Sequence, residues 1–88
     1  MNKIVRKEHF SANVVMLEIE APLIAKSRKA GHFVIVRVDE DGERMPLTIA
    51  DSDVARGTIT LVVQNMGASS TKLCNLTVGD EVLDLVGP

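Results

Sequence analysis

Short segments rich in β-branched residues recur along the chain and limit what it can fold into. About six of them follow one another at intervals of roughly 8–12 residues, separated by polar turns that carry Gly42 and Gly57. This spacing is typical of a small antiparallel barrel or sandwich. We expect strands at residues 3–9, 14–20, 33–38, 46–50, 58–64 and 81–86.

Two stretches have a helical pattern. Residues 23–26 are long enough for one turn at most. Residues 69–76 are the better candidate, because a leading serine can cap the amino end and Leu73 and Leu76 form an i, i+3 apolar pair. We therefore expect one short helix beside the strands.

Composition excludes several functional classes. The 88 residues suffice for one small domain, and 10 Lys and Arg against 12 Asp and Glu leave no basic footprint for nucleic acid or an anionic membrane. Trp and Tyr are absent, so a stacking surface for single-stranded nucleic acid is nearly missing. No apolar run approaches the roughly 18–20 residues of a membrane span. We expect no nucleic acid and no membrane among the partners.

Side chains that commonly carry catalysis are sparse. Cys74 is the single cysteine, which excludes an internal disulfide and an all-cysteine metal or iron–sulfur site in this chain. Without a disulfide framework, the cytoplasm is the expected compartment. Inert partial burial is favoured for Cys74 over a reactive thiolate. His9 and His32 belong to no catalytic pattern, and the acidic run at 39–43 lacks EF-hand spacing, so we predict neither catalytic residues nor a metal site.

A strand followed by a glycine, hydroxyl residues and a helix is the first element suited to a ligand. The segment contains Gly67, which permits close approach of the backbone, and then Ser69, Ser70 and Thr71. Backbone N–H groups at the amino end of a helix favour a phosphate, and hydroxyls add neutral donors. The same residues also fit an ordinary capped helix, so the motif alone leaves both interpretations open.

The second element lies at the entrance of the strand expected at 46–50. Arg44 carries forked donors that suit a diphosphate, and Thr48 offers a hydroxyl. Pro46 fixes φ and removes a backbone donor, which suits an edge or a bulge. By itself this segment favours a solvated arginine at the end of a strand.

Together, the two elements resemble the flavin-binding domain of the ferredoxin–NADP reductase superfamily. Within it, the chain is most similar to the small flavin subunit of NADH-dependent ferredoxin–NADP oxidoreductases, a type also known as a sulfide dehydrogenase subunit and akin to the electron-transfer subunit of dihydroorotate dehydrogenase. The resemblance rests on Arg-Met-Pro-Leu-Thr-Ile-Ala-Asp at 44–51, Gly-x-x-Ser-x-x-Leu at 67–73, Ala-Gly-His-Phe-Val at 30–34, Val-Gly-Asp at 78–80 and the final Gly-Pro.

The resemblance implies an all-β fold, a six-stranded antiparallel Greek-key barrel with one short helix that binds FAD at its open side. The FAD would relay electrons between a nicotinamide and iron–sulfur centres of an NAD(P)H:ferredoxin-type oxidoreductase. The flavin would perform the redox steps, but the nicotinamide-binding part would lie beyond Pro88, so this domain alone is expected to be inactive. NAD(P)H and a [2Fe–2S] cluster would bind outside this chain.

The resemblance also implies a set of FAD-binding residues in three segments. The segment at 44–48 would contact the isoalloxazine and a phosphate and would place a hydroxyl near the flavin N5. The segment at 62–64 would offer backbone groups to the cofactor. The segment at 67–71 would hold the diphosphate. Leu47 stands where the family commonly has an aromatic residue, so it would cover the ring by dispersion. The residues are Arg44, Pro46, Leu47 and Thr48 in the first segment, Val62, Val63 and Gln64 in the second, and Gly67, Ser69, Ser70 and Thr71 in the third.

We expect these residues to be part of a longer protein. The Gly87-Pro88 pair directly follows a strand and is interpreted as the start of a connection. The resemblance implies that a nucleotide-binding domain follows Pro88 and that a larger flavin and iron–sulfur subunit is a partner. The alternative hypothesis is a small non-enzymatic β-barrel that binds a protein through an exposed face, with its serines serving only as a helix cap.

Overall fold

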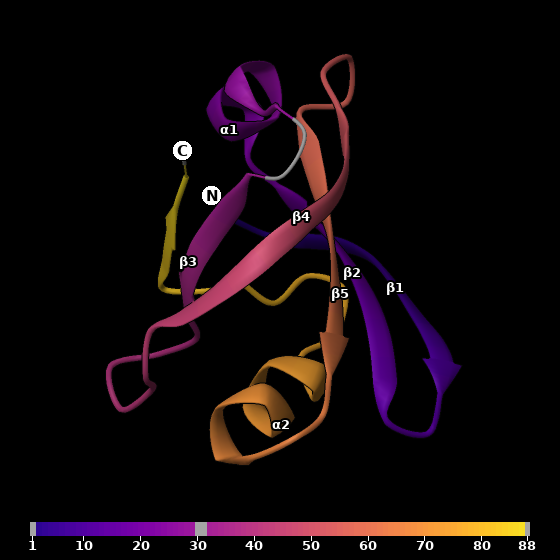
Figure 1. The fold of residues 1–88 in the computed structure, drawn as a ribbon, viewed down its shortest axis with the longest axis vertical. Coiled ribbons are helices and arrows are strands. Elements are labelled where there is room, and N and C mark those ends of the chain that lie inside the picture. The colour runs from indigo at the N-terminus through magenta and orange to yellow at the C-terminus, as the bar shows by residue number, and fades with distance from the viewer. Residues whose placement is uncertain (1, 30–31, 88) are drawn as a thin grey trace.

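Six antiparallel strands and two short helices form the part of the chain that a computed structural model describes, residues 2–29 and 32–87 (Figure 1). The strands lie in the order β1-β2-β5-β4-β3-β6. The prediction of six antiparallel strands is confirmed. The elements are β1 (Ile4–Ser11), β2 (Val14–Glu20), α1 (Pro22–Ser27), β3 (Phe33–Arg37), β4 (Met45–Asp53), β5 (Thr58–Gln64), α2 (Ala68–Cys74) and β6 (Asp84–Val86).

The structure corrects two sequence expectations in detail. The described residues contain two helices, whereas one was expected. The stretch at 23–26, expected to form at most one turn, belongs to α1, which starts at Pro22 and buries Ala25. Pro22 is favourable there, since a proline at the first helical position loses no hydrogen bond. The last strand is shorter than the expected 81–86. Residues 30, 31 and 88, which carry part of the motifs named above, lie outside the described residues.

The long strand β4 belongs to two ladders and makes the sheet curl. Its first half pairs with β3, where Phe33 lies opposite Thr48, and its second half pairs with β5, where Ile49 lies opposite Leu61. The register shifts between Ile49 and Asp51, as in a β-bulge, which increases local twist. Consequently the start of β4, next to the acidic turn at residues 39–43, lies apart from the end of β5, which leads into α2 (Figure 1).

The two edges of the sheet, β1 and β6, are not joined by a ladder among the described residues. A single antiparallel bridge between Lys3 and Glu81 links the segments that precede these strands. The sheet is therefore not closed into a barrel, and the Greek-key barrel implied by the resemblance is not confirmed in that detail.

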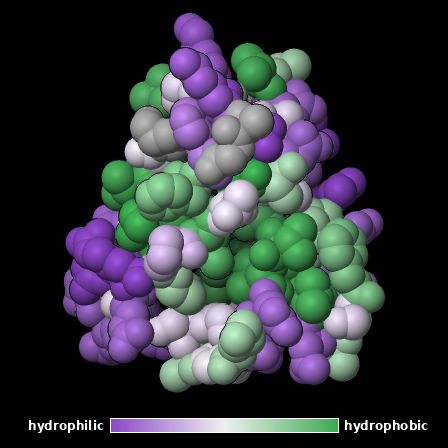
Figure 2. All heavy atoms as spheres, in the orientation of Figure 1, coloured by the Kyte–Doolittle hydropathy of each residue, from purple (hydrophilic) through white to green (hydrophobic). Residues whose placement is uncertain are grey.

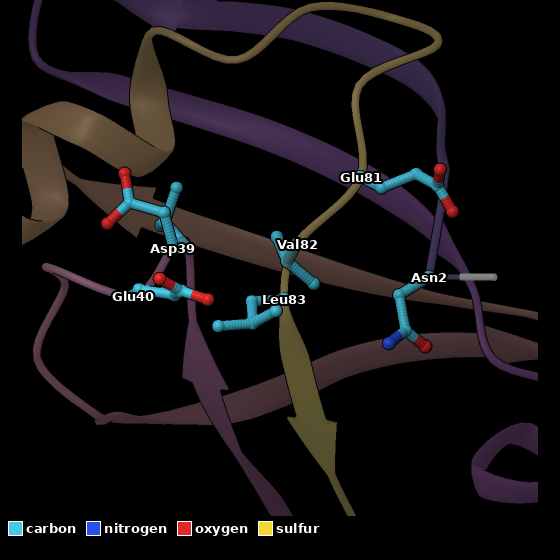
Figure 3. Close-up of a pocket in the computed structure, with 7 residues that line it drawn as sticks. Asn2, Asp39, Glu40, Glu81, Val82 and Leu83 are labelled. Carbon is cyan, nitrogen blue, oxygen red and sulfur yellow. The ribbon is translucent and has the colours of Figure 1, made fainter.

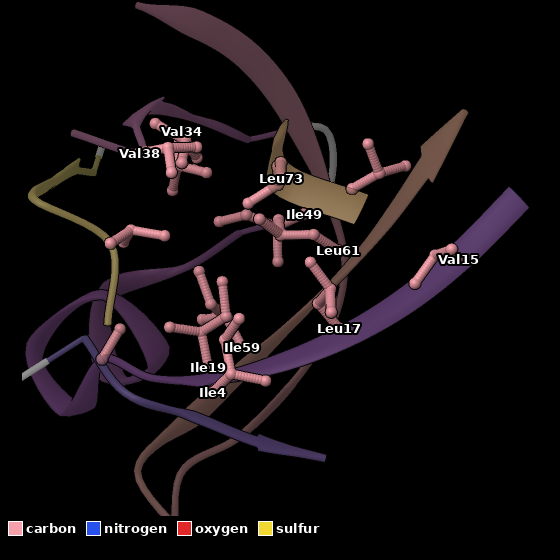
Figure 4. Packing of buried hydrophobic residues seen from close by; sticks show 14 of the residues in the cluster. Ile4, Val15, Leu17, Ile19, Val34, Val38, Ile49, Ile59, Leu61 and Leu73 are labelled. Carbon is pink, nitrogen blue, oxygen red and sulfur yellow. The ribbon is translucent and has the colours of Figure 1, made fainter. Parts of the chain in front are cut away.

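The core fills the concave side of the curled sheet. Leu17 and Ile19 of β2 and Ile59 and Leu61 of β5 are fully buried, because alternate residues of a strand share one face. Leu73 of α2 is also fully buried, so the helix covers one end of the core. Figure 4 shows these side chains directed toward one another. Neither helix is long and apolar enough to cross a membrane.

Candidate functional site

The loop between β5 and α2 is held by the hydroxyl of Ser70. Its Oγ accepts the backbone N–H groups of Met66 at 2.8 Å and Gly67 at 2.9 Å, and it donates to the Gly67 carbonyl at 3.2 Å. Thr71 donates its hydroxyl to the side-chain oxygen of Asn65. The hydroxyls of Ser70 and Thr71, predicted as phosphate ligands, are thus engaged within the protein and shape the loop.

The first turn of α2 leaves backbone donors free. Thr71 makes the first backbone bond of the helix, from its N–H to the carbonyl of Gly67 at 2.8 Å. The N–H groups of Ala68, Ser69 and Ser70 have no acceptor among the described residues, as is usual for the first turn of a helix. Gly67 has φ −176° and nothing within 4 Å of an added Cβ, so its backbone conformation is open to any residue.

An open hollow lies between the third predicted segment and the entrance of β4, and none of Arg44, Pro46, Leu47 and Thr48 is in its wall. It has a volume of about 440 Å³. Three of the residues predicted to bind the diphosphate, Gly67, Ser69 and Ser70, are in its wall. Four further wall residues were not predicted; these are Glu43, Met45, Met66 and Ala68.

The predicted residues on β4 divide between the two faces of the strand. Pro46 and Thr48 are exposed on its outer face, whereas Leu47 is half-buried and packs against the core. Arg44 lies before the strand, and its guanidinium is 3.7 Å from the carboxylate of Asp84 on β6. The Arg44 side chain is 58% exposed, so this contact is weak and leaves the guanidinium free to reorient.

The end of β5 has one unpaired side. Its pairing with β2 continues to Gln64, but its pairing with β4 ends at Leu61. Along Val62, Val63 and Gln64, the edge that faces β4 therefore lacks a partner strand in the described part of the chain. In the same area of the molecule, where β4 and β5 diverge above α2, apolar residues gather at the surface (Figure 2). Val62 is one exposed apolar residue of this strand, whereas Val63 is buried.

An ion pair joins α2 to the turn between β3 and β4. Lys72 of α2 lies beside Asp39, the first residue of the acidic run at 39–43 that leads to Glu43. The hydrogen bond from Lys72 lowers the pKa of the Asp39 carboxyl below its ordinary value, and the N–H groups of Asp41 and Gly42 act in the same direction. Asp39 is therefore a carboxylate at neutral pH.

A second hollow, of about 480 Å³, lies on the other side of that turn (Figure 3). Carboxylates of Asp39, Glu40 and Glu81 lie around it, together with Val82 and Leu83. This charge is unsuited to a phosphate group. No group of three His, Cys, Asp or Glu in the described residues is arranged to hold a metal ion.

Cys74 is buried at the end of α2. Burial raises the pKa of its thiol above the ordinary value, and the nearby charge of Lys7 opposes this effect only in part. The thiol is therefore protonated at neutral pH and enclosed by the core, as the inert interpretation predicted.

The chain has relatives among characterised electron-transfer proteins. No protein-family model matches it. It is 38% identical to the dihydroorotate dehydrogenase B (NAD(+)) electron transfer subunit homolog of Thermotoga maritima, over 100% of this chain and 31% of that protein. It is 32% identical to the dihydroorotate dehydrogenase B (NAD(+)) electron transfer subunit of Shouchella clausii, over 97% of this chain and 34% of that protein. An uncharacterized protein in the adh 3′ region of Clostridium beijerinckii is 49% identical over 100% of this chain and 30% of its own length.

A solved structure has nearly the same fold. It belongs to the NADH-dependent reduced ferredoxin–NADP oxidoreductase, described for flavin-based electron bifurcation, and it matches with a TM-score of 0.98 and 38% identity over 100% of this chain and 32% of that one. The chain thus spans about a third of the length of the proteins it matches.

Proposed function

Because the chain is a relative of the ferredoxin–NADP reductase-like flavin subunits, we propose that it binds FAD as part of an electron-transferring oxidoreductase. The diphosphate lies in the hollow beside Gly67–Ser70, and the isoalloxazine lies beside Pro46, Leu47 and Thr48. The flavin supplies the hydride and single-electron chemistry. The chain's own residues bind and orient it.

The observation that carries the proposal is the hollow shared by the entrance of β4 and the loop before α2. Two segments about twenty residues apart in the sequence meet there, as a ligand with a diphosphate and a ring system requires. The free N–H groups of Ala68, Ser69 and Ser70 suit the anionic part. Glu43 is the one carboxylate of the wall, and Arg44 beside it can reorient to offset that charge.

The ring end of the proposed ligand has a different environment. Thr48 offers an exposed hydroxyl, and the unpaired edge of β5 offers backbone groups of Val62 and Gln64 for the polar edge of a flavin, whereas the Val63 carbonyl already accepts the Cys74 thiol. The apolar surface where β4 and β5 diverge suits its fused rings (Figure 2). Leu47, packed against the core, would contact the ring only where its side chain reaches the surface.

Further parts of the proposal concern the whole protein. The relatives are about three times as long as this chain, which supports the proposal of a nucleotide-binding domain that follows Pro88 and binds NAD(P)H. A [2Fe–2S] cluster outside this chain and a larger flavin and iron–sulfur partner subunit are also proposed. The curled sheet, whose edges are linked only by the Lys3–Glu81 bridge among the described residues, is proposed to correspond to the Greek-key barrel of the family. The cytoplasm remains the proposed compartment.

Titration with FAD, FMN and riboflavin tests the proposal. The chain contains no Trp or Tyr, so flavin absorbance and fluorescence are observed without interference from the protein. FAD is expected to bind saturably and more tightly than riboflavin. The variant Ser69→Asp puts a carboxylate in the hollow and is expected to weaken FAD binding by about 5- to 150-fold, from a repulsion of about 1–3 kcal/mol.

The matched control is Ala55→Asp, which adds the same charge in the exposed turn between β4 and β5. It is expected to leave FAD affinity unchanged. The proposal is wrong when no flavin binds saturably, or when the two variants lose the same affinity.

The alternative of a protein-binding module is favoured by one observation. Leu23 is 81% exposed and Val86 is 55% exposed, and both belong to the end of the molecule that carries α1 and β6. A small apolar hollow of about 190 Å³ lies between α1 and β6, with Leu85 in its wall. Absence of flavin binding in the titration would favour this alternative.

A further inference from the structure

A lysine from the far end of the sequence holds the carboxyl end of α2. Lys7 of β1 donates from its Nζ to the carbonyl of Cys74 at 2.6 Å and to the carbonyl of Leu76 at 2.8 Å. Both contacts are partly buried and join residues that are 67 and 69 positions apart. The proposed FAD site, at the other end of this helix, does not include Lys7.

These two bonds have a clear physical basis. The last carbonyl groups of a helix have no partner within it, and a cation at this end is favoured by the helix dipole. Hydrogen bonds from a charged donor are stronger than those between neutral groups. Because the ammonium group is partly shielded from water, loss of the bonds would leave the two carbonyls poorly satisfied.

The position of α2 in turn sets the position of the loop in the hollow. The helix has only seven residues and is about 10 Å long, so a displacement of one end moves the other end with it. Its buried Leu73 and Cys74 fix its distance from the core. The interaction with Lys7 additionally ties its carboxyl end to β1.

We infer that Lys7 is a positioning residue for the diphosphate-binding loop, an inference that rests on the proposed function. Lys7 fixes α2 so that Gly67, Ser69 and Ser70 face the entrance of β4. The residue acts through the helix and does not touch the flavin. Its loss therefore weakens interactions of the loop with the diphosphate and leaves those of the β4 segment with the ring intact.

Binding of two ligands by matched variants tests this inference. FAD reports on both segments, whereas riboflavin has no phosphate and reports on the ring segment. Lys7→Met keeps the length of the side chain and removes its charge. It is expected to weaken FAD binding about tenfold and riboflavin binding less than about twofold. Lys7→Arg retains a cation with several donors and is expected to restore most of the FAD affinity.

The control variant is Lys26→Met, which removes an exposed lysine from α1 at the opposite end of the molecule. It is expected to bind both ligands as the unaltered chain does. When Lys7→Met does not fold, as judged by circular dichroism, Lys7→Gln is measured in its place, with the same ratio of the two affinities as the criterion.

The outcomes separate the inference from the proposed function. Equal losses for FAD and riboflavin, or no loss relative to Lys26→Met, overturn the positioning role of Lys7. Failure of the unaltered chain to bind FAD overturns the proposed function and with it this inference. A selective loss for FAD that Lys7→Arg reverses supports both.

Discussion

The Nζ atom of Lys72 lies 2.9 Å from each carboxylate oxygen of Asp39. This ion pair connects α2 with the turn between β3 and β4, and that turn leads to Glu43 and Met45 on the opposite wall of the proposed diphosphate site. The pair therefore ties α2 to the turn that leads to the opposite wall, although neither Lys72 nor Asp39 lines the hollow itself.

The ion pair predicts an acid-dependent contribution to stability. The pKa of Asp39 is lower in the folded chain than in the unfolded chain, so the contribution is complete above the ordinary aspartate pKa of about 3.9 and is lost as the pH falls through the lower folded value. Urea unfolding of the unaltered chain and Lys72→Met should differ above about pH 5 and converge as the pH falls below the folded pKa of Asp39. A small difference is expected, because both side chains are nearly half exposed.

A buried carboxylate of β2 stabilises the sheet. Glu18 accepts the hydroxyl of Thr58 at 2.6 Å and lies 3.6 Å and 3.4 Å from the guanidinium groups of Arg6 and Arg56. Glu18→Ala leaves all three without this acceptor and is expected to lower the free energy of unfolding by about 2–3 kcal/mol. The exposed Glu8→Ala on β1 is the control and should change it by less than about 0.5 kcal/mol, as measured by urea denaturation.

The two serines of the loop should respond differently to removal of the hydroxyl. Ser70→Ala takes the acceptor from the N–H groups of Met66 and Gly67, at an expected cost of about 1 kcal/mol. Ser69→Ala removes a hydroxyl without a partner among the described residues and should leave stability unchanged. Thermal unfolding of both variants measures the difference, and equal midpoints would contradict the role given to Ser70.

Gly87 is in close contact with α1. A Cβ at this position would lie 2.5 Å from Cγ1 of Ile24, and the β-branched side chain cannot easily move aside. Gly87→Ala should therefore destabilise the chain by about 1–3 kcal/mol. Gly67→Ala is the control for stability, because nothing lies within 4 Å of its added Cβ. Urea unfolding of both variants tests the contact, and the double variant Gly87→Ala, Ile24→Ala should show less than additive loss.

The buried thiol of Cys74 should be protected from alkylation. Because burial raises its pKa, little thiolate is available at neutral pH, and the core also blocks access. Iodoacetamide at pH 7.5 is expected to label the folded chain slowly and the chain in concentrated urea completely. Mass spectrometry over time measures both rates, and rapid labelling of the folded chain would show that the end of α2 opens.

Local patterns predicted most of the strands and one of the helices. Alternation and β-branching act over a few residues, so segments such as 14–20 and 58–64 were assigned with the bounds that the structure has for β2 and β5. The helix at α1 was underestimated, since burial of Ala25 against β5 supports it through contacts that its own sequence does not contain. The strand expected at 81–86 was too long, because only its last three residues find a partner in β3.

The candidate site was predicted as three separate segments. The role of each residue was harder to predict from the sequence than its position. Gly67, Ser69 and Ser70 were assigned to one phosphate-binding group, but the Ser70 hydroxyl holds the loop itself. Met45 and Met66 were missed as wall residues, because a methionine carries no signal for a ligand. Only their placement across one hollow identifies them.

The sequence by itself determined which segments form strands, where the loop before α2 begins and which family the chain resembles, because these depend on neighbouring residues and on short motifs. The tertiary structure alone decided that Lys7 holds the end of α2, that Lys72 reaches Asp39 and that β4 changes its partner from β3 to β5 at Ile49. Such contacts join residues far apart in the chain. They exist only once the sheet has curled around its core, and no local pattern contains that geometry.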